Sequence, residues 1–214
     1  MENEKITWGI FFSGGGRCAK DCLDLLTEGR LRGHKIKCVV TAGQPAGNLQ
    51  YFSDNQITII DRYPGDFGSI TEYQIWLADI LQKNKIDYLF LLGYKYRIRP
   101  ELLVPFKNRI LNIHPSLLPS FKNTQTAIQD AMDLGARVSG VTTHLIDEKI
   151  DEGFILDQEA VRIPRNTNFT TIDIAFNKAG KKLIERTFNL VKNEHKPNFY
   201  LDSYIKEHLG RSKT

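Results

Sequence analysis

Runs of apolar residues and helical repeats alternate along the chain. Short segments rich in aliphatic, aromatic and β-branched residues predict strands at residues 5–12, 36–41, 56–60, 87–92, 108–113, 138–146 and 154–163. Between them, apolar positions recur every three or four residues, which predicts helices at residues 17–27, 70–83, 126–134 and 170–193, and a short helix near 201–209. This alternation of strand and helix is typical of an α/β domain.

The last two predicted strands have a different pattern from the others. Segment 87–92 is almost wholly apolar, as a strand buried on both faces of a parallel sheet should be. Segments 138–146 and 154–163 instead alternate between apolar and polar residues, and their short connection favours an antiparallel pair. We therefore predict a Rossmann-like, doubly wound α/β sheet, mostly parallel with an antiparallel C-terminal strand pair. It would form one domain over residues 1–193, followed by a C-terminal tail or short helix at 194–214.

Composition and charge limit the kinds of molecule that this chain is expected to bind. The 29 basic and 25 acidic side chains give a net charge of +4 that is spread over the chain, which permits an anionic small molecule but does not favour a nucleic-acid groove. The apolar runs are far shorter than the ~20 residues that a membrane helix needs, and the first residues lack the apolar core of a signal peptide. We expect a cytoplasmic monomer or homodimer with no nucleic-acid or membrane partner. The 3 cysteines have no further ligands nearby, so no metal is expected.

A glycine-rich turn joins the first predicted strand to the first predicted helix. Amides at a helix N-terminus favour an anion, glycines let a ligand approach the backbone closely, and an arginine adds a charge-assisted contact. The residues expected to bind a phosphate there are Gly14, Gly15, Gly16 and Arg17. With Ala19 the turn also matches a dinucleotide fingerprint, but the second strand ends at 39–43 without the carboxylate that would hold a ribose. A tight turn that binds no ligand is the remaining alternative.

A pair of polar residues ends an otherwise apolar strand. Asn112 and His114 are two positions apart, so both project from the same face at the carboxyl end, where open α/β sheets bind ligands. Burying two such groups without partners would cost about 1–3 kcal/mol each. A lone histidine here would be typical of a satisfied core residue, but the pair, followed by Pro115 and Pro119, indicates a site.

An acidic loop follows the sixth predicted strand. A charged run such as residues 147–152 is usually a solvated hairpin tip. Asp151, however, lies shortly before Gly153, where the chain can turn sharply and fold back toward His114. A carboxylate beside an imidazole orients the ring and favours its protonated form. The sequence therefore allows Asp151 to pair with His114.

Three separated motifs stand out: residues 112–121, which read NIHPSLLPSF, residues 140–144, GVTTH, and residues 151–155, DEGFI. They resemble those of the tetrahydrofolate-dependent formyltransferases, most closely the glycinamide ribonucleotide type. The resemblance runs from the first strand to about residue 163 and implies the Rossmann-like formyltransferase fold. It also implies that the family's catalytic Asn, His and Asp correspond to Asn112, His114 and Asp151.

The chemistry that the resemblance implies fits these residue types. The co-substrate would be 10-formyltetrahydrofolate, whose formyl carbon is attacked by a primary amine through a tetrahedral oxyanion. Protonated His114 and the Asn112 amide would donate to the oxyanion, and Asp151 would help remove the amine proton, with no metal. The family's folate site lies against the loop after the fourth strand, and the acidic loop forms the other wall of that site. Without the resemblance, the loop after the fourth strand would indicate only a basic and aromatic surface turn. The residues assigned to folate on this basis are Lys95, Tyr96, Arg97, Ile98, Asp147 and Ile150.

The resemblance favours glycinamide ribonucleotide, a small phosphorylated amine of purine biosynthesis, as the acceptor. The chain departs from the family on the acceptor side: residues 14–18 read GGGRC in place of Gly-Asn-Gly-Ser-Asn, residues 124–127 replace a histidine-bearing segment, and 44–55 is short for a second helix. Asn123 replaces a glycine but tolerates left-handed geometry. A nucleotide-linked aminosugar or another small amine is therefore the alternative acceptor, and a non-catalytic nucleotide-binding module is the alternative class. Formylation of initiator tRNA, or hydrolysis of formyltetrahydrofolate, would be expected to need a further domain.

Overall fold

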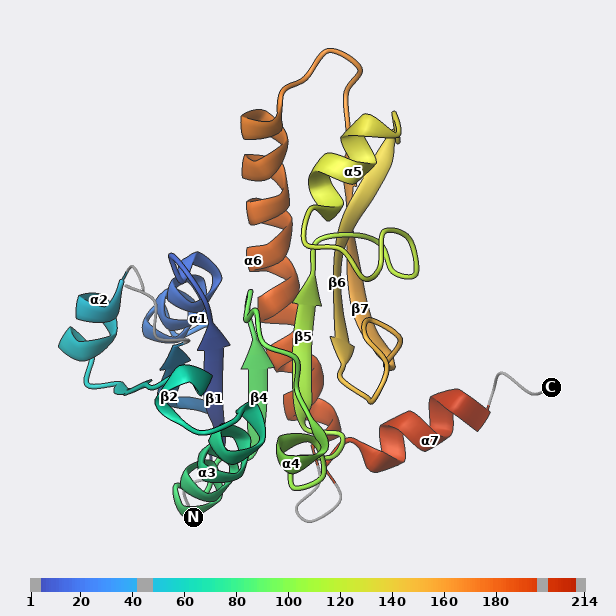
Figure 1. Cartoon of the computed structure of the whole chain (residues 1–214). Helices are drawn as coiled ribbons and strands as arrows, with labels where there is room; N and C mark the ends of the chain where they lie inside the picture. The colour runs from blue at the N-terminus through green and yellow to red at the C-terminus, as the bar shows by residue number, and fades with distance from the viewer. Residues whose placement is uncertain (1–4, 42–47, 196–199, 211–214) are drawn as a thin grey trace.

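The structure, a computed structural model, describes residues 5–41, 48–195 and 200–210 (Figure 1). Its seven-stranded sheet contains, in chain order, β1 (Ile6–Phe12), β2 (His34–Thr41), β3 (Thr58–Asp61), β4 (Tyr88–Leu91), β5 (Ile110–His114), β6 (Val138–Leu145) and β7 (Ile155–Arg162). The spatial order is β3-β2-β1-β4-β5-β6-β7. Strands β1 to β5 are parallel, and β6 and β7 each run antiparallel to the strand before. The predicted fold class is therefore confirmed.

Helices cover both faces of the sheet. They are α1 (Arg17–Thr27), α2 (Leu49–Asp54), α3 (Ile70–Lys83), α4 (Pro100–Leu103), α5 (Ala127–Asp133), α6 (Phe169–Glu194) and α7 (Asp202–Gly210), with a 3₁₀ turn, η1, at Pro64–Asp66. α1 and the long α6 pack on one face, and α3 and α4 pack on the other (Figure 1). The side chains of β1 alternate accordingly, because Trp8, Ile10 and Phe12 join the core under α1 and α6 whereas Phe11 packs under α3.

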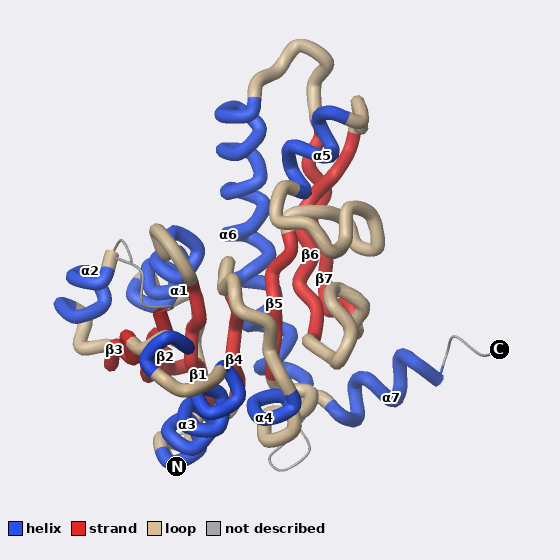
Figure 2. The backbone as a smooth tube through the Cα atoms, viewed as in Figure 1, coloured by secondary structure: helices blue, strands red, loops and turns tan. Residues whose placement is uncertain are grey.

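A crevice forms where the winding of the sheet reverses, between β1 and β4. From β1 the chain moves outward to β2 and β3, then crosses back to β4 and β5. The turns after β1 and β4 touch, since the Ser13 amide donates to the Gly93 carbonyl at 3.0 Å. The loop after β4 then runs back beside β5 to α4 (Figure 2). Open α/β sheets bind ligands at such a reversal, so this topology places the glycine turn and the loop after β4 at the expected site.

Short helices are the main elements that the periodicity did not predict. α2, η1 and α4 are each too short to show a helical repeat, and residues 44–47 of the segment 44–55 lie outside the described residues. Apolar spacing would also place Ile75 inside α3, but Ile75 is 55% exposed and the polar Gln74 is buried instead. Among the residues that the structure describes, no helix combines the length and apolar character needed to cross a bilayer.

The C-terminal helix is anchored to the sheet. Leu201 is fully buried in the same core cluster as β1 and α6. Asn108 Nδ2 donates to Asp202 Oδ1 at 2.6 Å, which ties the start of α7 to the turn before β5. The domain boundary at residue 193 stays a prediction, although the segment after it contributes Leu201 to the main core.

A buried histidine makes the stability of the fold depend on pH. Trp8 Nε1 donates to His34 Nδ1 at 3.0 Å, so Nδ1 is unprotonated, and His34 is 2% exposed. Burial, with a smaller effect from the Lys192 cation, lowers the pKa of His34 from 6.5 to about 4. The unfolded chain therefore binds this proton more readily than the folded protein. Stability contributed by neutral His34 is fully present above pH 6.5 and is lost as the pH falls toward 4.

Replacing His34 with asparagine should reduce this pH dependence. The asparagine oxygen can still accept from Trp8 but does not titrate. Between pH 7 and pH 4.5 we expect the native protein to lose about 2–3 kcal/mol more unfolding free energy than His34→Asn. Urea unfolding at several pH values measures the difference, and equal pH slopes in the two proteins would contradict the assignment.

Candidate active site

The tip of β5 projects Asn112 and His114 from one face of the sheet, as strand alternation predicts. In the antiparallel register with β6, Asn112 lies opposite His144 and His114 lies opposite Thr142. Asn112 Nδ2 and His144 Nε2 are 3.1 Å apart. The two β5 side chains therefore lie beside a second buried histidine, which the sequence analysis included in a motif without assigning it a role.

The two ring nitrogens of His114 have different partners. Nε2 lies 2.8 Å from the Phe121 carbonyl oxygen, and because a carbonyl only accepts, Nε2 carries a proton. Nδ1 faces Asp151 Oδ2 at 3.5 Å, and the side chain is 6% exposed. Phe121 has a φ of 52°, which is strained for a bulky residue and is typical of a functional turn. Nδ1 is therefore the ring atom of His114 that remains for chemistry.

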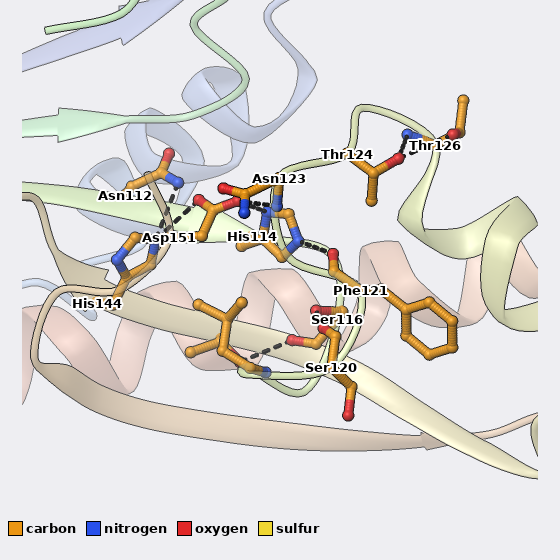
Figure 3. Close-up of polar contacts among 12 residues, drawn as sticks. Asn112, His114, Ser116, Ser120, Phe121, Asn123, Thr124, Thr126, His144 and Asp151 are labelled. Carbon is orange, nitrogen blue, oxygen red and sulfur yellow. Dashed lines mark hydrogen bonds and ion pairs between the residues drawn. The ribbon is translucent and has the colours of Figure 1, made fainter. Parts of the chain in front are cut away.

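Asp151 reaches the two histidines from the loop between β6 and β7. Its Oδ2 accepts the Asn123 amide at 2.9 Å and faces His114, while its Oδ1 lies 3.7 Å from His144 Nε2 (Figure 3). Asp151 has a φ of 56° and Asn123 a φ of 59°, left-handed conformations that Asp and Asn tolerate better than most residues. The structure thus brings Asn112, His114 and Asp151 together around the tip of β5.

The loop that carries Asp151 is tied to both neighbouring loops. Arg97 Nη2 donates to the Glu148 carbonyl at 2.9 Å, and Lys122 Nζ lies 2.6 Å from Glu152 Oε1. The Lys122 cation lowers the pKa of the Glu152 carboxyl. Exposed pairs of this kind add little stability, but the two contacts show that the loop packs against its neighbours. The acidic segment is therefore not a free hairpin tip.

Gly153 permits a close approach of backbones and does not make the sharp turn that the sequence analysis assigned to it. The left-handed φ in this loop belongs to Asp151. A Cβ on Gly153 would lie 1.8 Å from the Leu145 carbonyl oxygen, a backbone atom. Gly140 is similarly constrained, because its Cβ would lie 2.2 Å from the Glu159 carbonyl oxygen. Both glycines let the backbone around β6 and β7 pack closely.

Gly153→Ala should destabilise the fold and displace Asp151. Admitting the methyl group requires the backbones to separate, at a cost of about 2 kcal/mol or more. Urea unfolding measures the loss. Gly15→Ala is the matched control, because a Cβ there meets no atom within 4 Å. Equal destabilisation of the two variants would contradict the close-approach argument.

A cavity of about 330 Å³ opens beside the cluster formed by Asn112, His144 and Asp151. It is lined by all the residues that the sequence analysis assigned to folate, namely Lys95, Tyr96, Arg97, Ile98, Asp147 and Ile150. Leu91 and Ile98 give it a buried apolar wall, whereas Lys95 and Lys149 are exposed at its rim. Such a cavity suits a flat ring system inside and an anionic group outside.

The wall of this cavity formed by the loop after β4 depends on Gln74, which the sequence analysis missed. Gln74 is fully buried in α3. Its Nε2 donates to the Arg97 carbonyl at 2.8 Å, and its Oε1 accepts the Arg99 amide at 2.8 Å. The sequence does hold a signal for Gln74, which is a polar residue among the inward-facing positions of an amphipathic helix. A buried amide needs hydrogen-bond partners, so such a residue indicates a polar contact.

A second cavity, of about 430 Å³, lies by the same strand tips. Ile113 lines this cavity whereas Asn112 lines the first, so the tip of β5 contributes to both. Of the predicted phosphate turn, the lining residues are Gly15, Gly16 and Arg17, while Gly14 is outside the lining. Gly16 has a φ of 64°, and a Cβ there would lie 2.6 Å from the Phe12 ring, so the turn requires glycine at this position.

Arg17 is paired with a carboxylate across the second cavity. Its Nη1 lies 3.1 Å from Asp173 Oδ2 on α6, and Asn177 Nδ2 donates to the same oxygen at 3.1 Å. Arg17 is 58% exposed, so the pair is weak, and the guanidinium keeps other donors. Arg17 and Asp173 are 156 residues apart in the chain, and nothing in the sequence pointed to their contact. Within the described residues, no group of three or more His, Cys, Asp or Glu could hold a metal ion.

A family model and several curated proteins match this chain. Residues 8–188 match the family model described as formyl transferase. Phosphoribosylglycinamide formyltransferase, chloroplastic, from Arabidopsis thaliana is 35% identical over 166 residues, which cover 73% of this chain and 55% of that protein. Phosphoribosylglycinamide formyltransferase from Haemophilus influenzae is 31% identical over 154 residues, 72% of each chain. The chain spans about half the length of the chloroplastic relatives from Arabidopsis thaliana and Vigna unguiculata.

Solved structures agree with these matches. The crystal structure of phosphoribosylglycinamide formyltransferase from Bacillus halodurans superposes with a TM-score of 0.82 and 30% identity, covering 91% of this chain and 98% of that one. Glycinamide ribonucleotide transformylase 1 from Symbiobacterium toebii superposes with a TM-score of 0.82 and 29% identity, covering 87% of each chain.

Proposed function

The chain belongs to the formyl transferase family, and we propose that it transfers a formyl group from 10-formyltetrahydrofolate to the primary amine of glycinamide ribonucleotide, a reaction of purine biosynthesis. The observation that carries the proposal is the convergence of Asn112, His114 and Asp151 at the strand tip that contributes to both cavities. One cavity would hold the formyl donor and the other the acceptor. The amine and the formyl carbon would then meet beside these three side chains.

Asn112 and His114 are suited to stabilise the oxyanion of the tetrahedral intermediate. Asn112 Nδ2 directs one N–H toward His144 and has a second one available. Protonated His114 would donate from Nδ1, because its Nε2 is already occupied by the Phe121 carbonyl. Donors aimed at developing charge in a site with little water are the largest contribution to many acyl transfers, and each is worth about 10²–10³ in rate.

Asp151 would carry the proton that the reaction moves. The new bond between the amine nitrogen and the formyl carbon forms as the bond from that carbon to N10 of the folate breaks. The amine loses one proton and N10 gains one, so the reaction is balanced without an external acid or base. Asp151 Oδ2, held by the Asn123 amide, can accept the proton through a water and return it to N10.

The first cavity fits the folate. Its apolar wall, which includes Leu91 and Ile98, would pack against the flat pterin, and the exposed Lys95 and Lys149 would face the carboxylates of the glutamate tail. The residues that would hold the folate are those assigned from the sequence: Lys95, Tyr96, Arg97, Ile98, Asp147 and Ile150.

The second cavity would hold the acceptor, with Gly15, Gly16 and Arg17 at its phosphate. A nucleotide-linked aminosugar is the second candidate acceptor. The pairing of Arg17 with Asp173 favours it, because a neighbouring carboxylate weakens the attraction of a terminal phosphate. The cytoplasmic location and the monomeric or homodimeric state stay predictions.

The proposal is tested with purified protein, 10-formyltetrahydrofolate and a panel of amines. The panel contains glycinamide ribonucleotide, a nucleotide-linked aminosugar and an amine-free control. We expect absorbance from released tetrahydrofolate to rise with glycinamide ribonucleotide, and mass spectrometry to find the formylated amine. Turnover with the aminosugar alone would reassign the acceptor. Tight NAD binding with no folate binding would replace the proposal with a nucleotide-binding module.

A further inference from the structure

His144 lies beside the proposed catalytic side chains and has no step in the reaction. It sits on β6 opposite Asn112, and its side chain is 2% exposed. Its Nε2 faces two groups, Asn112 Nδ2 at 3.1 Å and Asp151 Oδ1 at 3.7 Å. The shorter contact is the one to the amide, and its direction depends on where the imidazole carries its proton.

The backbone decides the tautomer of His144. Its Nδ1 lies 3.0 Å from the Leu145 carbonyl oxygen, which can only accept, so Nδ1 carries the proton. In the neutral ring Nε2 then has a lone pair, and the Asn112 amide donates to it. Burial lowers the pKa of His144, and the nearby His114 acts in the same direction, whereas the hydrogen bond to the Leu145 carbonyl, Asp151 and Asp147 oppose the shift. The neutral ring therefore prevails near neutral pH.

A neutral His144 selects one of the two orientations of the Asn112 amide. Rotation about the last side-chain bond of asparagine is broad, so the strand alone does not decide whether Nδ2 or Oδ1 faces the cavity. With Oδ1 toward His144, two lone pairs would face each other. With Nδ2 toward His144, one N–H is used and the other remains free. Held by Nδ2, the amide therefore presents its second N–H from a fixed position, where it can donate to an oxyanion.

We propose that His144 is a positioning residue, whose neutral imidazole holds the Asn112 amide so that its second N–H points to the formyl oxygen. This inference rests on the proposed function. It assigns His144 an effect on the transition state that passes through Asn112.

The test is a double-mutant cycle in the formyl-transfer assay. His144→Leu replaces the ring with an apolar side chain and so removes the hydrogen-bond acceptor Nε2. We expect it to lower kcat about 10- to 100-fold with both KM values changed less than about twofold. In an Asn112→Ala background the same change should alter kcat less than about twofold, because the positioned amide is already gone. His144→Gln, whose side-chain oxygen can accept near the position of Nε2, should recover most of the rate.

Two outcomes would overturn the inference and leave the proposed function standing. One is an equal loss from His144→Leu with and without Asn112. The other is full activity of His144→Leu in a protein whose Asn112→Ala variant is impaired. Absence of formyl transfer by the native protein would instead refute the proposed function.

A measurement on the native protein does not depend on whether any variant folds. Nitrogen-15 NMR of the imidazole reports the tautomer directly. We expect a protonated Nδ1 and an unprotonated Nε2 for His144 at neutral pH. A protonated Nε2 would rule out the hydrogen bond from Asn112 and with it the proposed role.

Discussion

Replacement of His114 with alanine is expected to lower kcat about a thousandfold and to change both KM values less than about threefold. The His114 ring is buried, its Nε2 donates a hydrogen bond to the Phe121 carbonyl, and its Nδ1 faces Asp151. It therefore contributes when negative charge develops on the formyl oxygen and contributes little to binding of the ground state. Steady-state assays of tetrahydrofolate release give both constants.

A second variant separates the catalytic loss from a structural one. His114→Gln can still donate to the Phe121 carbonyl but cannot be protonated, so it should lose as much kcat as the alanine variant and less thermal stability. His208→Ala, on the exposed face of α7, is the matched control and should keep the native rate. A native kcat in both His114 variants would remove this residue from the mechanism.

Asp151→Asn is expected to reduce kcat about as strongly, by two to three orders of magnitude. Asparagine has the same shape and keeps an oxygen to accept the Asn123 amide, which the carboxylate accepts at 2.9 Å. It has neither the negative charge beside His114 nor the ability to take a proton from the amine. The fold should therefore be preserved while the proton transfer fails, as circular dichroism and the kinetic assay would show.

Glu152→Gln is the control for Asp151→Asn. Glu152 is the next residue in the same loop, but it is exposed and paired with Lys122. Its neutralisation changes the local charge equally and should leave kcat within about twofold, since exposed pairs contribute little. Equal losses in the two variants would mean that the charge of the loop, and not a carboxylate at position 151, supports the reaction.

The sheet and its main helices could be predicted because periodicity is local. The wholly apolar β4 is buried on both faces, as its sequence predicts. The alternation in β6 is less informative, because Ser139 to Leu145 are all buried. The two-residue period of a strand placed Asn112 and His114 on one face. The backbone conformation at Asn123 could also be predicted locally, because asparagine is compatible with the left-handed φ of 59° found there.

Other parts of the site carried too little signal in the sequence. The group that orients His114 is the carbonyl of Phe121, a backbone atom that every residue type possesses. Gln74 shapes the wall of the first cavity from a helix in which neighbouring positions suggested only a core. Gly153 was assigned to a turn, but its requirement comes from the Leu145 carbonyl on another segment. The role of each residue depends on a neighbour that is distant in the chain, or on a backbone atom that is the same in every residue type.

By itself the sequence determined the α/β class, the antiparallel end of the sheet, the two polar residues at the tip of β5 and the likeness to formyltransferases. Only the tertiary structure decided that Asp151 reaches both His114 and His144, and that Arg17 meets Asp173. The physical reason is that burial patterns repeat within each segment, whereas distances between side chains depend on how separate segments pack.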